Sequence, residues 1–358
     1  MIRRGFLGEV IYLISLNTRL NPGFLVFLMQ TIFYGLFFYF SYLLLVIQKN
    51  LLPFILLIFS PFLFTFQIYD FQGGYRKEII YFALLAVLTW VARRKSKKTS
   101  ETVFYLSLLV YPLLILSHEM LVFYLPYLLI IFFSVFDLDK KRLLNISILL
   151  IPSLISFAAC LYYSGTSQQI SNISESLIKM DYQIILGSIA WLDKTTDYAI
   201  QQVLLAIKNK QYFFYLLTLV FSLGAFVPVI KRFKHIIKNK LLLLLFLASI
   251  IASVTLFVVA LDWGRFIYIH LVSWFFISLM SKGNSQSKSS NEVQTEMKTI
   301  QDFSIIKAPL LFLFVIFYAF SWHIPYCCKP IPYPQNISNS NIFLLLVPYK
   351  RLALRLNM

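Results

Sequence analysis

Long apolar stretches recur along the chain, and they limit its fold more than any other feature. Each is about 16 to 24 residues long, close to what an α-helix needs to cross the roughly 30 Å hydrocarbon core of a bilayer. Hydrophobic residues make up 59% of the 358 residues and charged residues only 13%. A soluble protein cannot bury that much apolar surface. We therefore expect an all-α fold, a polytopic integral membrane helix bundle.

About ten stretches qualify as transmembrane helices by length and composition. We assign them to one transmembrane domain that covers residues 1–358. The candidate spans are 24–48, 51–68, 79–92, 102–117, 120–136, 144–163, 212–230, 241–260, 266–280 and 308–323.

Basic residues between the spans orient the chain. The groups at 93–98, 140–142 and 231–240 fall on one side if successive spans alternate, and the positive-inside rule makes that side the cytoplasm. The net charge of +17 therefore reports topology, and we exclude a nucleic-acid partner. The Ser-rich stretch 281–307 is then a flexible cytoplasmic loop, and 324–358 is an external tail.

Residues 164–211 form a long external, periplasmic loop in this topology. Apolar residues in its second half predict short helices on the membrane surface. They are Ile184, Ile185, Ile189, Trp191, Leu192, Val203, Leu204 and Ile207. Such helices either cover a lateral groove or simply pack on the bundle.

Four polar clusters interrupt the apolar chain, and the topology places all four on the external face. They are Arg3-Arg4-Gly5, Gly73-Gly74-Tyr75-Arg76-Lys77-Glu78, His118-Glu119 and Asp262-Trp263-Gly264-Arg265. Ionisable side chains are costly near a bilayer, so their convergence at one end of a bundle indicates a functional site. Arg3 and Arg4 oppose the positive-inside rule at an external N-terminus. Either they serve a ligand, or the chain begins late and an upstream helix is missing.

The basic members of these clusters suit a phosphate-bearing ligand. Arg76 and Lys77 stand where the third span begins, and a helix N-terminus with added positive charge commonly binds phosphate. Arg265 and Arg4 add two further guanidinium groups. The alternative for this stretch is a tight external turn with interfacial anchors, in which Glu78 favours the helix N-terminus.

Acid–base chemistry is predicted for three other residues. His118 and Glu119 together make a general base with an orienting partner, since His titrates near neutrality, or they only form a turn or pack in the bundle. Asp262 orients a hydroxyl or Arg76 while Arg265 binds a phosphate, or it simply pairs with Arg265 three residues later. His270, about two turns into the ninth span, either reaches the same cavity or is a packing residue.

Several motifs are absent from the sequence. There is no Walker A sequence, no Gly-x-Ser-x-Gly, no His-Glu-x-x-His and no zinc-type cysteine spacing. We expect no cofactor and assign no metal ligand, and a requirement for a divalent metal stays open.

Arginines beside carboxylates and a histidine at the external mouth of a bundle favour an enzyme acting on a lipid-linked phosphate substrate. A polyprenyl-diphosphate donor places its diphosphate at headgroup level, where Arg76, Arg265 and Arg4 would hold the leaving group. Glu119, His118 or Asp262 would remove a proton from the acceptor hydroxyl.

The same clusters carry a family resemblance. The order Arg-Arg-Gly-Phe-Leu-Gly, Gly-Gly-Tyr-Arg-Lys-Glu, Ser-His-Glu-Met and Asp-Trp-Gly-Arg-Phe over residues 3–266 resembles bacterial surface-polysaccharide membrane proteins. Among these, it resembles O-antigen polymerases and GT-C glycosyltransferases. The resemblance implies a multi-pass enzyme of the bacterial inner membrane that joins undecaprenyl-diphosphate-linked units on the periplasmic side.

The choice within this class stays open at the level of sequence. Polymerases typically carry arginines in large periplasmic loops, and 164–211 contains none. GT-C enzymes offer an acidic residue in the first external loop, for which Glu9 or Asp70 is the nearest match. A transporter or flippase for the same lipid-linked sugar, or a structural subunit, are further alternatives, although charges at one face only argue against transport.

Overall fold

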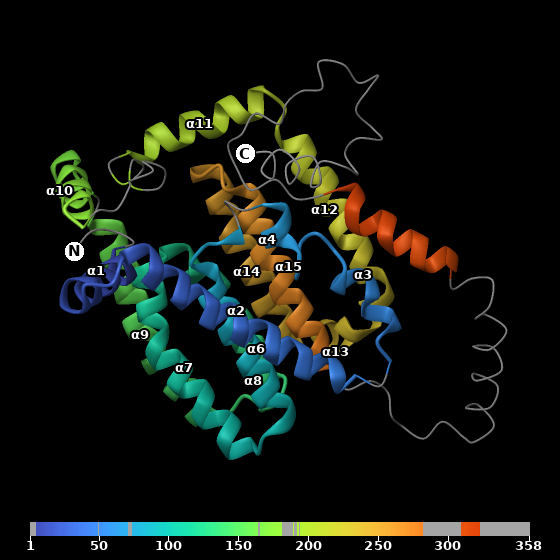
Figure 1. Ribbon diagram of the computed structural model, residues 1–358. Coiled ribbons are helices and arrows are strands. Elements are labelled where there is room, and N and C mark those ends of the chain that lie inside the picture. Colours follow the sequence, from blue (N-terminus) through green and yellow to red (C-terminus); the bar gives the residue numbers. More distant parts are fainter. Residues whose placement is uncertain are drawn as a thin grey trace, which may run out of the picture.

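The computed structural model describes residues 5–48, 50–70, 74–163, 165–180, 189, 192, 194–281 and 309–322. Every regular element in these residues is a helix, which confirms the all-α fold (Figure 1). Six helical stretches are long and apolar enough to cross a membrane, as expected of a multi-pass membrane protein. They are Pro22–Val46, Lys97–Ser117, Lys140–Tyr162, Tyr212–Lys238, Lys240–Val259 and Trp263–Met280.

Helix α15 (Trp263–Met280) is the axis of the bundle. All of its residues except Trp274 are buried, because neighbouring helices surround it. The elements packed around it are α6 (Glu78–Arg94), α8 (Leu125–Phe133), α12 (Tyr212–Phe226), η4 (Val227–Phe233) and α14 (Lys240–Val259). A helix that is apolar on all sides and buried is typical of the centre of a membrane bundle.

Outer helices complete the bundle and expose apolar side chains. Helices α2 (Pro22–Val46) and α7 (Lys97–Ser117) pack on α6, and α9 (Lys140–Tyr162) packs on α7. Large hydrophobic residues such as Phe27 and Leu109 point away from the bundle. Lipid chains can cover such a surface, whereas water cannot do so without a large free-energy cost.

The predicted second span, 51–68, is not one helix. It consists of η1 (Leu52–Phe54), α3 (Ile55–Ile58) and α4 (Phe66–Tyr69), joined by a turn over residues 59–65. Ser60 and Pro61 fall at the break, and Pro cannot donate the next helical hydrogen bond. Irregular backbone at membrane depth is tolerated where protein covers it. That condition holds here, because Phe54, Leu57, Phe62, Leu63 and Phe66 are fully buried.

The basic groups gather at one end of the bundle. Arg93, at the end of α6, donates to the carbonyl of Met280 at the end of α15 (3.1 Å). Arg232, in η4, donates to Gln48 Oε1 just after α2 (2.8 Å). The C-terminal ends of these elements therefore meet, as simple alternation of the spans requires.

The remaining elements lie around the bundle. They are α1 (Phe6–Thr18), η2 (Glu119–Tyr124), α10 (Ser167–Ile178), α11 (Thr196–Lys208), α13 (Lys234–Lys238) and the helix Pro309–Ser321. Helix α11 contains the predicted apolar residues Val203, Leu204 and Ile207, and it packs on α14 (Figure 1). The predictions for Ile184 to Trp191 other than Ile189, for the loop after Ser281 and for the tail 324–358 concern residues outside the described part.

Candidate functional site

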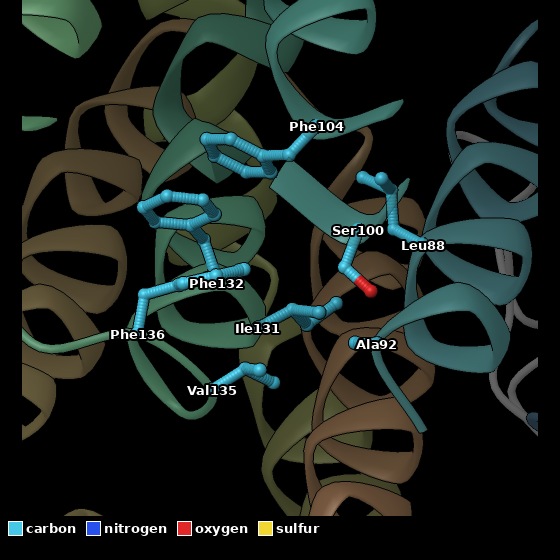
Figure 2. A pocket seen from close by; sticks show the side chains of 8 residues that line it. All are labelled: Leu88, Ala92, Ser100, Phe104, Ile131, Phe132, Val135 and Phe136. Carbon is cyan, nitrogen blue, oxygen red and sulfur yellow. The ribbon is translucent and has the colours of Figure 1, made fainter. Parts of the chain in front are cut away.

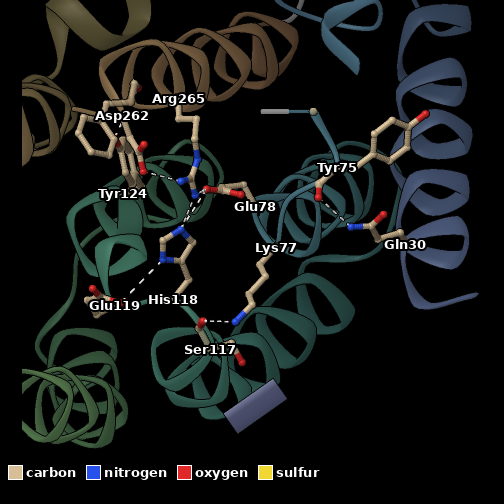
Figure 3. Close-up of polar contacts among 12 residues, drawn as sticks. Gln30, Tyr75, Lys77, Glu78, Ser117, His118, Glu119, Tyr124, Asp262 and Arg265 are labelled. Carbon is tan, nitrogen blue, oxygen red and sulfur yellow. Dashed lines mark hydrogen bonds and ion pairs between the residues drawn. The ribbon is translucent and has the colours of Figure 1, made fainter. Parts of the chain in front are cut away.

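Three helix ends bring five ionisable residues together at the end of the bundle opposite the basic groups. Glu78 Oε1 accepts a hydrogen bond from Arg265 Nη2 and lies 3.0 Å from His118 Nε2. Arg265 Nη1 donates to Asp262 Oδ2 at 2.6 Å, and Glu119 Oε2 lies 3.8 Å from His118 Nδ1. Figure 3 shows the Arg265 guanidinium pointing toward Asp262, Glu78 and His118. We call Glu78, His118, Glu119, Asp262 and Arg265 the Arg265 cluster.

Local sequence explains why these side chains meet. Glu78 is the first residue of α6, where a carboxylate favours the helix N-terminus. His118 ends α7 with extended backbone (φ −159°, ψ 95°), and Glu119 follows at the start of η2. Asp262 occupies the N-cap position of α15, one turn before Arg265. Because the chain reverses with almost no loop at both points, the side chains are held within the bundle.

The cluster is almost closed to solvent. The side chains of Glu78, His118 and Arg265 are only 4%, 7% and 6% exposed, and Glu119 is buried as well. Asp262 differs, since a quarter of its side chain is exposed. Burying separate charges is expensive, and mutual pairing offsets part of that cost. Asp262 is therefore the residue of the cluster that solvent or an incoming group can reach most easily.

The two nitrogens of His118 stand in different situations. Nε2 lies within hydrogen-bonding distance of Glu78 Oε1 (3.0 Å) and of Arg265 Nη2 (2.7 Å). A guanidinium only donates and a carboxylate only accepts, so Nε2 satisfies Glu78 when it carries a proton and Arg265 when it does not. Nδ1 is buried and makes no hydrogen bond to any described residue. The imidazole thus has two tautomers with different partners.

A second buried atom lacks a hydrogen bond. Glu78 Oε2, like His118 Nδ1, has no hydrogen-bonding partner within the described part of the chain. Buried polar atoms in folded proteins nearly always have one, and the exceptions need an explanation. Two such atoms on side chains that contact each other indicate a place where a further polar group binds.

The other residues predicted to bind phosphate are Lys77, Arg76 and Arg4. Lys77 Nζ donates to the carbonyl of Ser117 (3.2 Å), the last residue of α7. Arg76 is half-buried and lies just before the start of α6. Arg4 is outside the described residues. Arg265, also predicted to bind phosphate, contacts two of the predicted acid–base residues, His118 and Asp262.

Gly74, four residues before the start of α6, serves the packing of the chain. A Cβ on Gly74 would lie 2.5 Å from the Cα of Gln67, so no side chain fits there. Tyr34 Oη donates to the Gly74 carbonyl, and Gln30 Nε2 donates to that of Tyr75 at 3.0 Å (Figure 3). Gly74 packs against α4, and this contact holds the corner that leads to Glu78.

His270 belongs to a separate group deeper in the bundle. Its Nδ1 lies 2.6 Å from Tyr127 Oη and its Nε2 lies 2.8 Å from Ser253 Oγ. Trp274 Nε1 donates to the same Tyr127 oxygen at 2.8 Å. Both ring nitrogens are satisfied by neutral partners, which is typical of a packing residue. Tyr127 and Ser253 are single hydroxyl-bearing residues within apolar helices, and nothing in the sequence marks them as partners of His270.

A small pocket lies between α6, α7 and α8, toward the basic end (Figure 2). It is lined by Leu88, Ala92, Ser100, Phe104, Ile131, Phe132, Val135 and Phe136. The Ser100 hydroxyl already donates to the Val91 carbonyl at 3.1 Å. Without an ionisable side chain the pocket offers no chemistry.

Among the described residues, no group of three or more His, Cys, Asp or Glu side chains is arranged to hold a metal ion. The donors nearest to such a set are the carboxylates of the Arg265 cluster, and Arg265 pairs with two of them. The metal requirement and the absence of a cofactor remain predictions.

No protein-family model, curated protein or solved structure matches this chain. The site is therefore interpreted from its own chemistry.

Proposed function

We propose that this protein is a glycan-assembly enzyme of the bacterial inner membrane. It polymerises or transfers sugars from a polyprenyl-diphosphate-linked donor on the periplasmic face, as an O-antigen or capsule polymerase does. The observation that carries the proposal is the buried Arg265 cluster at the end of the bundle opposite the basic loops.

The position of the cluster suits a lipid-linked substrate. It lies at helix ends, where the diphosphate of a membrane-embedded polyprenyl lipid would meet the protein. A guanidinium offers two parallel N–H donors that match a phosphate, and Arg265 contacts both an acid and a histidine. Few other places in a membrane bundle combine these groups, because intramembrane charge is costly.

The residues divide the reaction between them. The bond from the anomeric carbon to the diphosphate oxygen breaks, and a new bond forms from that carbon to the acceptor oxygen. His118 Nδ1 takes the acceptor's proton, while Glu78 holds the Nε2 proton and orients the ring. Arg265 stabilises the charge that develops on the departing diphosphate. Glu119, 3.8 Å from Nδ1, faces the position where the acceptor hydroxyl would lie.

Transfer of a single sugar by a GT-C type enzyme uses the same chemistry, so both variants of the proposal share one site. Transport of the lipid-linked sugar has less support. A flippase needs a polar path through the midplane, and the buried polar group there, around His270, is neutral and satisfied internally.

The surface-glycan profile of a deletion strain tests the proposal. The strain is complemented with the wild type, with Arg265→Ala, or with Asp197→Asn, an exposed residue of α11 that serves as a matched control. Wild type and control restore the profile. Loss of long chains with single units retained identifies a polymerase, and a shortened or altered unit identifies a single-sugar transferase. A profile that does not depend on the gene would refute both.

A further inference from the structure

We propose that Asp262 is a resident anion that the substrate's diphosphate displaces from Arg265, and that this exchange sets the tautomer of His118 that acts as the base. The inference rests on the proposed function, because it names the diphosphate of a lipid-linked donor as the incoming group.

Asp262 stands at a helix N-cap without capping the helix. Asp is favoured there because its carboxylate accepts hydrogen bonds from the first backbone amides. In α15 the Asp262 side chain makes no such bond, and it pairs with Arg265 Nη1 at 2.6 Å instead. The first turn of a helix is where an N-cap carboxylate ordinarily binds, so the start of α15 is a second position for Asp262.

Arg265 pairs with the carboxylates of Glu78 and Asp262, and an incoming anion cannot replace both with equal ease. Glu78 is 4% exposed and lies on α6, so moving it would leave a buried charge unpaired. Asp262 is 25% exposed and can move to the start of its own helix. An incoming anion therefore displaces Asp262 and leaves Glu78 in place.

In the resting site the Asp262 carboxylate contacts Arg265 at Nη1. The oxygens of a diphosphate can bind a guanidinium in bidentate fashion and so engage both Nη atoms. One Nη2 proton of Arg265 points at His118 Nε2 at 2.7 Å, a shorter contact than that from Nε2 to Glu78. We assign to the resting ring the tautomer that accepts from Arg265 at Nε2 and carries its proton on Nδ1, where it cannot act as a base.

When the contact with Arg265 is lost, the imidazole of His118 changes to its other tautomer. Nε2 takes a proton from a water molecule, keeps it, and donates a hydrogen bond to Glu78 Oε1. The Nδ1 proton passes through the Glu119 carboxylate to the hydroxide that the water leaves, so water forms again. The ring and the cluster gain no net proton. Nδ1 is left with a lone pair, ready to accept the proton of the acceptor hydroxyl. The base is thereby formed only when the donor's diphosphate is in place.

Binding measurements test the exchange. Full-length protein in nanodiscs is titrated with inorganic pyrophosphate and with undecaprenyl diphosphate. Asp262→Asn keeps a side chain of the same shape but removes the competing charge, so it should bind both ligands about three- to tenfold more tightly than the wild type. Arg265→Lys, a point charge, should bind about tenfold more weakly, and Asp197→Asn should not differ. Equal or weaker binding by Asp262→Asn would overturn the exchange. Equal affinity of the wild type for the two ligands would overturn the assignment to a lipid-linked group.

Nitrogen NMR tests the second step. The chain has four histidines, so ¹⁵N-histidine labelling gives few signals, and His118→Gln identifies the relevant pair. The wild type should show its proton on Nδ1 at rest and on Nε2 at saturating pyrophosphate. A tautomer that does not change on saturation rejects the coupling.

Different results would reject the glycan function and the anion exchange at Arg265. A normal glycan profile in the deletion strain, together with tighter pyrophosphate binding by Asp262→Asn, would leave the anion exchange and remove the glycan function. An altered profile with no effect of Asp262→Asn on binding would do the reverse.

Discussion

His118 and His270 are both buried in the same bundle, yet their surroundings differ. Each nitrogen of His270 has one neutral partner, Tyr127 or Ser253. His118 shares one nitrogen between a carboxylate and a guanidinium, and its other nitrogen makes no hydrogen bond to a described residue.

The contrast separates a structural histidine from a chemical one. A fully satisfied neutral network rigidifies a core and gains nothing from a change of protonation. A ring set among charges, with one nitrogen unsatisfied, responds to any group that enters. Burial alone does not distinguish the two, since both side chains are nearly inaccessible.

Removal of Arg265 should have the largest effect. Arg265→Ala leaves the buried Glu78 carboxylate without its guanidinium partner, and breaking a buried ion pair in this way typically costs about 3–5 kcal/mol. We expect loss of activity and a lower free energy of unfolding, measured by reversible denaturation in detergent with SDS.

A double variant separates fold from chemistry. Arg265→Met with Glu78→Leu removes both charges and replaces them with apolar volume, which is often neutral for stability. It should unfold near the wild-type midpoint and have no activity. An active double variant would show that the cluster serves only the fold.

Substitution of the two histidines tests the contrast directly. His118→Gln should reduce turnover by about 10²–10⁴-fold, the usual contribution of a general base, with a smaller loss of stability. His270→Gln should cost about 1–3 kcal/mol by leaving buried polar groups unsatisfied, and turnover per folded molecule should stay close to wild type. If both variants lost turnover equally, the two histidines would not differ in role.

Sequence alone predicted much of this arrangement, for physical reasons. Apolar length and the positive-inside rule indicate most of the spans and their alternation. The pairing of Asp262 with Arg265 follows from their spacing of three residues on a helix. The break at Ser60 and Pro61 was missed because apolar composition hides a local interruption, and non-helical backbone there depends on cover by distant residues.

The central position of Glu78 was harder to predict. Sequence favoured Glu119 as the partner of His118 because they are adjacent. The structure instead places Glu78 against the imidazole, 40 residues away in the chain. Contacts between separate helices depend on helix rotation and on corners such as Gly74, and neither has a signature in a single sequence.

Gly74 offers a smaller perturbation of the same site. Gly74→Ala brings a Cβ within 2.5 Å of the Gln67 backbone, so the corner before α6 must shift, at a cost of about 1–3 kcal/mol. Gly35→Ala is the control, because nothing lies within 4 Å of its Cβ, and Ala favours the helix. Equal stability of the two variants, measured by the same SDS titration, would contradict the close packing of Gly74.

Substitution of Lys77 should change stability and turnover least. The same variant tests whether Lys77 binds the phosphate together with Arg265. Lys77 Nζ donates a hydrogen bond to the carbonyl of Ser117, the last residue of α7 and the residue before His118. The Lys77 side chain is partly exposed. Lys77→Met keeps the apolar stem and removes one hydrogen bond, so we expect a loss of about 0.5–1.5 kcal/mol and a severalfold reduction in turnover. The affinity for pyrophosphate should change little, because Lys77 acts by positioning His118. If Lys77→Met weakened pyrophosphate binding as strongly as Arg265→Lys, Lys77 would be a direct phosphate ligand. The anion site would then extend from Arg265 to the start of α6, as the sequence first indicated.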